Sequence, residues 1–444
     1  ITFYTTQNYF SYNLTCSSKF TVMNVFLTIS DAKALDSEDA LRPLRKKFYL
    51  PNWKGEDSIY LSGNSLGPQP KNAKKALLQE LKDWEELGVA GHFKANKPWF
   101  SYHEYFSKSL SRLTGAKETE VICMGSLTAN LHFALTSFYR PTKKRKIILC
   151  EKKAFPSDRY ALISKLKMHN LTESELLEVN GSDSTGVPND EDILKAISIH
   201  GDSISLVLVG GVNYYTGRLY DMKRITKAAK EKGITVGWDL AHAVGNVPLN
   251  LNKWNIDFAV WCSYKYLNSG PGGTAGMFIH ENHHKSDLPK LAGWWGHNKA
   301  TRFKMGDEFD PIKTAESWQV SNAPVLSMSA LRASLDIFDA VPLESLRNKS
   351  LALSQCIMQM IDHLSEETGE KIKIITPRED AKRGGQVSVQ FENRNNSFFQ
   401  QISKNGVIAD WREPGTIRMA IAPLYNSYED ISKLEKALKD SLET

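Results

Sequence analysis

Two short segments of this sequence bring together an acid, an imidazole and an amine. The first is Asp239-Leu-Ala-His242, and the second is Ser263-Tyr-Lys265, which runs into a glycine-rich stretch at 269–273. Each segment directly follows an apolar, β-branched run, so each is expected at the end of a buried strand. A lysine at such a position can have a lowered pKa and act as an amine nucleophile or base. The spacing therefore predicts a site for amine-based chemistry.

The elements that must position these residues are short strands alternating with helices. Four apolar runs are predicted as strands, at 146–150, 204–209, 234–238 and 258–262. A helix is predicted over 221–232, with Asp221 as its N-cap and Gly233 just beyond its end. This rhythm indicates an α/β fold with a mainly parallel sheet. Ligands of such sheets bind beyond the carboxyl ends of the strands, where Asp239 and Lys265 would meet.

The pattern changes along the chain. A helix is predicted over 71–87 from the helical spacing of Ala73, Ala76, Leu77, Leu81 and Trp84. After about residue 325 come long helices at 328–340 and 344–366 and strands at 386–391 and 417–421. A closing helix begins at Ser427, with Asp430 as its capping-box partner. We expect a large domain over 71–325 and a smaller α+β domain over 326–444, which the segment 23–70 joins.

The first 22 residues precede Met23 and are rich in Thr, Tyr, Asn, Ser and Phe. They lack the basic start and apolar run of a secretory signal, and are expected to be a disordered or artefactual extension. The triplet Asn13-Leu-Thr15 matches a glycosylation sequon, a pattern that is common by chance.

Composition narrows the class of protein. The 444 residues carry 56 basic and 50 acidic side chains, a net charge of +6, without a basic run interleaved with aromatics, so no nucleic-acid partner is expected. No apolar stretch is long enough to span a membrane, so no membrane partner is expected. The five scattered cysteines, Cys16, Cys123, Cys150, Cys262 and Cys356, argue against a disulfide framework or a zinc site and predict a cytoplasmic protein.

The Asp-x-Ala-His and Ser-x-Lys segments resemble those of the fold type I pyridoxal-phosphate enzymes. This resemblance implies a large domain with a mainly parallel sheet and a smaller α+β domain. Further segments resemble the kynureninase family, in order from about residue 40 to the C-terminus: Tyr60-Leu-Ser-Gly-Asn-Ser-Leu-Gly67, Gly91-His92, Lys97-Pro-Trp99, Ala154-Phe-Pro-Ser-Asp158, Tyr215-Thr-Gly217, Asp239-Leu-Ala-His-Ala-Val-Gly-Asn246, Trp261-Cys-Ser-Tyr-Lys-Tyr-Leu-Asn268, Leu291-Ala-Gly-Trp294 and Pro423-Leu-Tyr-Asn-Ser427.

This resemblance implies a site for pyridoxal 5'-phosphate. Lys265 would carry the cofactor, Asp239 would pair with its ring nitrogen, and Phe155 would lie over the ring. Leu127 and Thr128, at the start of a helix, would hold the phosphate. The other implied cofactor-binding residues are Pro156, Ser157, Asp158, Gly210, His242, Tyr264, Trp294 and Asn322, of which Trp294 and Asn322 would come from the partner in a homodimer.

The resemblance also implies a substrate site and no metal. Arg418 would grip the substrate carboxylate, for which a guanidinium is well suited. Arg418 also lies in an apolar strand-like run, where an unpaired charge is costly, and this by itself favours a function. Ser65, His92 and Asn322 would contact the aryl side of the substrate.

The implied reaction is hydrolysis of the Cβ–Cγ bond of L-kynurenine or 3-hydroxy-L-kynurenine, in tryptophan breakdown. The products would be anthranilate or 3-hydroxyanthranilate, plus L-alanine. Lys265 would move the Cα proton, and Tyr264 is the candidate acid or proton relay of the later steps.

Two alternative functions stay open from the residues. One is an aminotransferase or cysteine desulfurase of the same fold, although Cys356, the only cysteine after Lys265, lies in a helical pattern that suits packing. The other is an inactive binding module, which the presence of Lys265, Asp239 and Arg418 together disfavours.

Two positions depart from the family pattern. Gly210 stands where a serine is usual, so one side-chain contact to the cofactor is expected to be missing. Met419-Ala-Ile-Ala-Pro423 replaces the usual Val-Ala-Pro-Val-Pro beside Arg418, which leaves the pocket shape there open.

Overall fold

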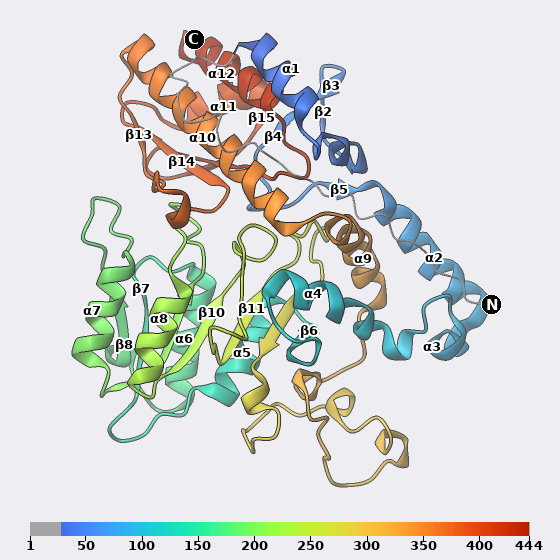
Figure 1. The fold of residues 1–444 in the computed structure, drawn as a ribbon. Coiled ribbons are helices and arrows are strands. Elements are labelled where there is room, and N and C mark those ends of the chain that lie inside the picture. The colour runs from blue at the N-terminus through green and yellow to red at the C-terminus, as the bar shows by residue number, and fades with distance from the viewer. Residues whose placement is uncertain (1–27, 444) are drawn as a thin grey trace, which may run out of the picture.

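A seven-stranded sheet forms the centre of the larger part of the molecule (Figure 1). The computed structural model describes residues 28–443, so the predicted extension 1–22 and its sequon lie outside the described residues. The strand order is β6 (Val121–Cys123), β12 (Gly276–Ile279), β11 (Phe258–Trp261), β10 (Thr235–Asp239), β9 (Ile204–Gly210), β7 (Ile147–Glu151) and β8 (Leu176–Val179). β12 pairs antiparallel with both β11 and β6, and the other four pairings of the sheet are parallel. The mainly parallel sheet is confirmed, and the four predicted strands end within one residue of the observed ones.

Helices cover both faces of this sheet. Leu206 and Leu208 of β9 belong to the core that packs under α5 (Leu127–Phe138) and α6 (Pro156–Met168). The alternate residues Val207 and Val209 belong to the core with α7 (Asp190–His200) and α8 (Met222–Glu231). Because successive side chains of a strand point to opposite faces, a strand buried on both sides must be apolar throughout. This explains the continuous apolar runs of the sequence.

The predicted helix ends are confirmed at two helices. Asp221 caps α8 by accepting a hydrogen bond from the Arg224 N–H at 3.0 Å, and Gly233 just beyond its end has φ +69°. Ser427 and Asp430 form the reciprocal capping box of α12 (Tyr428–Leu442).

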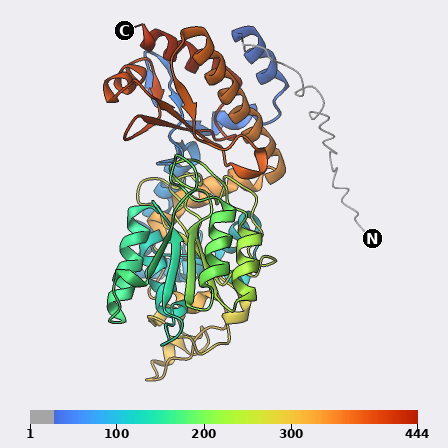
Figure 2. The same ribbon diagram turned by 90° about the vertical axis from the view of Figure 1, so that its left-hand side faces the viewer.

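A second, smaller core lies around an antiparallel sheet with the order β13 (Ile372–Ile374), β14 (Gln386–Phe391), β17 (Thr416–Ala420) and β16 (Asp410–Arg412). Its helices are α10 (Leu343–Thr368), α11 (Asn396–Lys404) and α12. The N-terminal residues join it: α1 (Ile29–Glu38) packs against α12, and β4 (Ile59–Tyr60) pairs with β15 (Val407–Ile408). Figure 1 shows this blue N-terminal segment beside the red C-terminal helices, and Figure 2 shows the two parts one above the other.

The boundary between the two cores differs from the predicted residue 326. Met328 and Leu335 of α9 (Val325–Asp339) are buried in the core of the central sheet, as is Leu346 near the start of α10. Leu353, further along α10, belongs to the smaller core. We propose that the division lies within α10, which passes from one core to the other.

The remaining helices and strands are short or lie at the side of the molecule. They are α2 (Lys71–Leu87), α3 (Gly91–Lys94), α4 (Ser107–Thr114), β1 (Phe48–Tyr49), β2 (Asn52–Trp53), β3 (Glu56–Asp57) and β5 (Gln69–Pro70). Within residues 28–443, no helix combines the length and the apolar character needed to cross a membrane.

The helix α2 confirms the predicted range but presents its apolar side chains outward. Leu77, Leu81 and Trp84 are 37%, 38% and 59% exposed. The helix instead buries two acidic side chains: Glu80 accepts hydrogen bonds from the Trp99 indole and the Tyr102 hydroxyl, and Asp83 accepts from the Asn96 N–H. The apolar stripe of α2 is therefore not used in the core of this chain.

The absence of a side chain at Gly237 in β10 is a packing requirement, and we predict that Gly237→Ala destabilises the fold. A Cβ there would lie 2.1 Å from the Phe258 ring, which itself stacks on Phe138 at 4.9 Å. The forced shift should lower the free energy of unfolding by about 1–3 kcal/mol. Chemical denaturation measures it, with Gly306→Ala as control because a Cβ at Gly306 meets nothing within 4 Å. Equal stability of the two variants would contradict the prediction.

Candidate active site

The candidate site lies at the carboxyl ends of β10 and β11. Asp239 is the last residue of β10, and His242 and Lys265 follow β10 and β11. The Lys265 Nζ lies 3.0 Å from the His242 Nε2 and 5.7 Å from the centre of the Phe155 ring. Phe155 is 42% exposed and directly precedes Pro156, the first residue of α6.

The His242 ring is held neutral. Burial, followed by the charges of Lys265, Arg418 and Arg412, lowers its pKa well below the ordinary value. A neutral ring can accept a hydrogen bond from the Lys265 ammonium through Nε2. Its Nδ1 is buried and has no hydrogen-bond partner among the described residues, so it is available to a bound molecule.

Two buried carboxylates face each other behind the amine. Burial and the negative charge of Asp239 raise the pKa of Asp158 well above its ordinary value. Asp239 accepts a hydrogen bond from the Ala241 N–H at 2.8 Å, while Oδ1 of Asp158 is buried without a partner within residues 28–443. Adjacent buried carboxylates are stabilised by a shared proton or a cationic donor. A protonated ring nitrogen supplies such a donor, so these residues fit pyridoxal phosphate.

The start of α5 suits the phosphate of that cofactor. Ser126 caps the helix, and Thr128 in its first turn shares a 2.7 Å hydrogen bond with the Ser157 hydroxyl of α6. Two hydroxyls beside the free amides of a twelve-residue helix form a favourable anion site. Leu127 begins this helix, and Tyr264 is half-buried near Cys262, with burial raising the pKa of its hydroxyl.

Gly210 ends β9 as the register partner of Asp239. Its N–H donates to Oε1 of Glu151 at 3.1 Å, and a Cβ at Gly210 would lie 3.1 Å from the same oxygen. The buried Glu151 carboxyl thus takes the space next to the position where a serine is usual. This gives a physical reason for the departure from the family pattern.

Arg418 lies on β17 and is buried, with 2% of its surface exposed, and its guanidinium group forms an ion pair. Its Nη2 contacts Oδ2 of Asp410, and its Nη1 donates to the Tyr214 carbonyl at 2.6 Å. The Tyr214 ring in turn meets the Phe155 ring edge-on at 5.3 Å, which links Arg418 to the Lys265 surroundings. Ser65 donates to the same Asp410 oxygen at 2.8 Å, so it lies on the Arg418 side of the site.

Three of the predicted residues lie elsewhere in this chain. His92 is on α3, which Figure 1 shows at the edge of the molecule away from β10 and β11. The Trp294 indole donates to the Arg302 carbonyl at 3.1 Å, and its ring is 44% exposed. Asn322 is exposed in the turn before α9. The chain by itself does not bring these three residues to Lys265.

Sequence reasoning did not single out Glu151, Tyr214 or Asp410. Glu151 ends a parallel strand, so the rule that led to Asp239 applied to it equally. Asp410 is the cross-strand partner of Arg418, a relation that only the register of β16 and β17 reveals.

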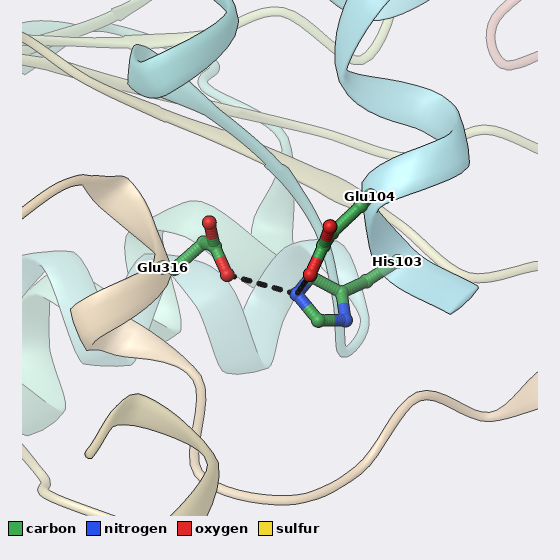
Figure 3. A group of neighbouring side chains, drawn as sticks. All are labelled: His103, Glu104 and Glu316. Atoms are coloured by element: carbon green, nitrogen blue, oxygen red, sulfur yellow. Dashed lines mark hydrogen bonds and ion pairs between the residues drawn. The ribbon is translucent and has the colours of Figure 1, made fainter. Parts of the chain in front are cut away.

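His103, Glu104 and Glu316 form a group whose ligand atoms lie close enough to hold a metal ion (Figure 3). The His103 Nε2 lies 2.9 Å from the Glu316 carboxylate. The Lys299 ammonium lies 2.7 Å from Glu316 and 2.8 Å from Glu104, so it already supplies a cation between them. Burial by itself raises the pKa of Glu316. The hydrogen bonds from His103 and Lys299 outweigh this effect and lower the pKa to about 2. The group acts as an ion-pair cross-link.

The buried Glu151 predicts a pH-dependent stability. Burial, with a contribution from Asp239, raises its pKa from 4.5 to about 7. Between pH 4.5 and 7 the folded chain therefore retains a proton that the unfolded chain has released, and the stability falls as the pH rises, by on the order of 3 kcal/mol. Glu151→Gln should remove this loss, so that the variant exceeds the native chain in stability at pH 8 but not at pH 4.5.

Thermal unfolding at the two pH values measures this effect. Glu178→Gln is the matched control, because hydrogen bonds from Lys152 and Arg159 lower the pKa of Glu178 despite its partial burial. That variant should lose stability at pH 8. Equal destabilisation of Glu151→Gln at both pH values would refute the prediction.

Comparison with known proteins gives the family. A family model described as the kynureninase C-terminal domain matches residues 346–438. The kynureninase of Christiangramia forsetii is 48% identical over 416 residues, which cover 93% of this chain and 97% of the relative. The kynureninases of Flavobacterium psychrophilum and Nematostella vectensis are 46% and 43% identical, over 94% and 93% of this chain and 98% and 94% of the relatives.

Solved structures share the fold at low identity. A cysteine desulfurase from Thermococcus onnurineus NA1 superposes with a TM-score of 0.75 at 18% identity, covering 90% of this chain and 98% of that chain. The cysteine desulfurase CsdA from Escherichia coli gives a TM-score of 0.71 at 14% identity, with coverage of 91% and 98%. These likenesses confirm the predicted fold class. With 43–48% identity to kynureninases along nearly its whole length, the chain belongs to the kynureninase family.

Proposed function

We propose that this chain hydrolyses the Cβ–Cγ bond of L-kynurenine or 3-hydroxy-L-kynurenine. The products are anthranilate or 3-hydroxyanthranilate, plus L-alanine. The observation that carries the proposal is the Lys265 amine, 3.0 Å from a neutral His242 at the end of the sheet, in a chain 48% identical to the kynureninase of Christiangramia forsetii.

The residues at the sheet edge are proposed to hold pyridoxal 5'-phosphate. Lys265 would bind it covalently, Asp239 and Asp158 would face its ring nitrogen, and Phe155 would cover the ring. The α5 N-terminus, with Thr128 and Ser157, would hold its phosphate. When bound, the cofactor supplies an electron-withdrawing ring next to the substrate α-carbon.

The side chains of this chain then bind the substrate and move protons. Arg418 holds the substrate carboxylate, and the Lys265 Nζ takes the Cα proton and returns it. His242 stays neutral, because burial and the Lys265 charge lower its pKa, and its Nε2 accepts a hydrogen bond from the Lys265 Nζ, which orients the amine. Tyr264 is the proposed acid, since burial keeps its hydroxyl protonated. Water is the second reactant.

A cysteine desulfurase activity is less well supported, because the chain lacks a suitable thiol after Lys265. Cys356 lies within α10, packed against the smaller core, and burial raises its pKa to about 11. A reactive cysteine needs an accessible thiolate, which this position disfavours.

A homodimer completes the site in this proposal. The exposed apolar side chains of α2 and the segment after it, Leu77, Leu81, Trp84, Val89 and Phe93, form the kind of surface that a second subunit covers. We propose that His92, Trp294 and Asn322 reach the site of the partner subunit. The cytoplasmic location stays a prediction from the cysteine pattern, and the four cysteines within residues 28–443 are free thiols.

The reaction has a direct test. The purified protein should be yellow and should convert kynurenine to fluorescent anthranilate and alanine. Lys265→Ala should lose the borohydride-sensitive visible band and lower kcat/KM by roughly 10⁴-fold, because it removes both the covalent anchor and the base. Lys165→Met is the control, because Lys165 is a buried lysine of α6 outside the proposed site, and this variant should retain the band.

The products decide between the alternatives. A colourless native protein would contradict the cofactor assignment. Formation of kynurenic acid or another keto-acid product in place of anthranilate would favour an aminotransferase.

The shared site predicts complementation between two inactive variants. If Trp294 serves the site of the partner, Lys265→Ala and Trp294→Ala each abolish activity alone. A mixed dimer then contains one intact site, with Lys265 from one subunit and Trp294 from the other. Refolding the two chains together at equal concentration should restore about a quarter of the native activity. Sedimentation analysis confirms dimer formation, and a mixture that stays inactive while dimeric would contradict the shared site.

A further inference from the structure

The antiparallel sheet of the smaller core has one polar face. Ser388 of β14 and Asp410 of β16 are both register partners of Arg418 on β17, and Arg412 is the partner of Thr416. Because side chains alternate along strands, these residues share a face. The opposite face carries Val387, Val389, Ile417 and Met419, which are buried in the smaller core.

On this polar face one carboxylate joins two guanidinium groups. Oδ2 of Asp410 contacts the Arg418 Nη2, and Oδ1 of Asp410 contacts the Arg412 Nη1. The Ser65 hydroxyl donates to Oδ2 at 2.8 Å. Asp410 is 11% exposed and Arg418 only 2%, whereas the Arg412 side chain is 39% exposed.

The charges of this triad do not balance. Two guanidinium groups and one carboxylate leave one net positive charge, with Arg418 and Asp410 buried and Arg412 partly exposed to water. The Arg418 Nε is also buried without a hydrogen-bond partner among the described residues. Asp410 neutralises only one of the two guanidinium groups, and the net positive charge attracts an anion, so the triad is suited to one further anion.

We propose that Arg412 is a substrate-recognition residue that supplies the charge neutralised by the substrate carboxylate, while Asp410 holds Arg412 and Arg418 together. This inference rests on the proposed function, in which Arg418 binds that carboxylate. Without Arg412, Arg418 and Asp410 form a neutral pair, which attracts an anion far less than a site with net positive charge.

The charge of Arg412 also acts on the groups around Lys265. Burial lowers the pKa of His242 most, and the positive charges of Lys265, Arg418 and Arg412 lower it further. The same two arginines lower the pKa of Tyr214, although burial raises it overall. The positive field of Arg412 therefore reaches the groups around Lys265.

The experiment compares Arg412→Gln with Arg412→Lys in the cofactor-loaded enzyme. Arg412→Gln removes one charge-assisted interaction. It should therefore raise KM for kynurenine by about 10–100-fold and keep kcat within about 3-fold of the native value. Arg412→Lys keeps the charge and should stay within about 5-fold of the native KM. Arg394→Gln, which breaks the Arg394–Glu370 ion pair elsewhere in the smaller part, is the matched control and should leave both constants unchanged.

A second measurement isolates the carboxylate. L-alanine carries a carboxylate, and ethylamine is the same amine without it. The binding of each is followed by the change in visible absorption of the cofactor. Arg412→Gln should weaken L-alanine binding by the same factor as KM and leave ethylamine binding unchanged. Equal weakening of both ligands, or native KM in Arg412→Gln, would overturn the role of Arg412. Failure of the native enzyme to hydrolyse kynurenine would overturn the proposed function instead, and the alanine comparison would still report on Arg412.

Discussion

The contact of the Lys265 amine with a buried imidazole, beside two buried carboxylates, is the interaction on which the rest of this structure depends. His242, Asp239 and Asp158 are buried at the carboxyl ends of parallel strands, and the partly exposed Lys265 reaches His242 there. Keeping such groups apart from water requires a sheet covered on both faces, which the two helical layers provide. The same burial makes the groups reactive, because it lowers the pKa of His242 and raises that of Asp158.

A second constraint joins the two cores. Arg418 belongs to the smaller sheet, yet its Nη1 bonds to the Tyr214 carbonyl of the larger part. Tyr214 also contacts Phe155, beside the amine. Two parts with separate apolar cores thus meet through polar contacts at the site. Polar contacts of this kind adjust more readily than a shared apolar core, which suits a site that must admit and release its substrate.

The helix α2 reverses the usual arrangement of an amphipathic helix. It buries Glu80 and Asp83 in hydrogen bonds from neighbouring side chains and backbone, and it exposes Leu81 and Trp84. The satisfied carboxylates explain why the buried polar face is stable, and the exposed apolar face explains why a partner subunit is proposed. His92 lies just after this helix, so a surface that binds a partner would also carry His92 to it.

The sequence by itself determined the strand and helix order, the α/β class and the placing of Asp239 and Lys265 at one sheet edge, because these follow from local periodicity and from the geometry of parallel strands. It also contained the polar alternation of Ser388, Asp410, Arg412 and Arg418. Only the tertiary structure decided that Asp410 is the partner of Arg418, that Glu151 occupies the space beside Gly210, and that the apolar side of α2 faces outward. These features depend on strand register and on which face of a helix meets the core, and both are set by contacts between residues far apart in the sequence.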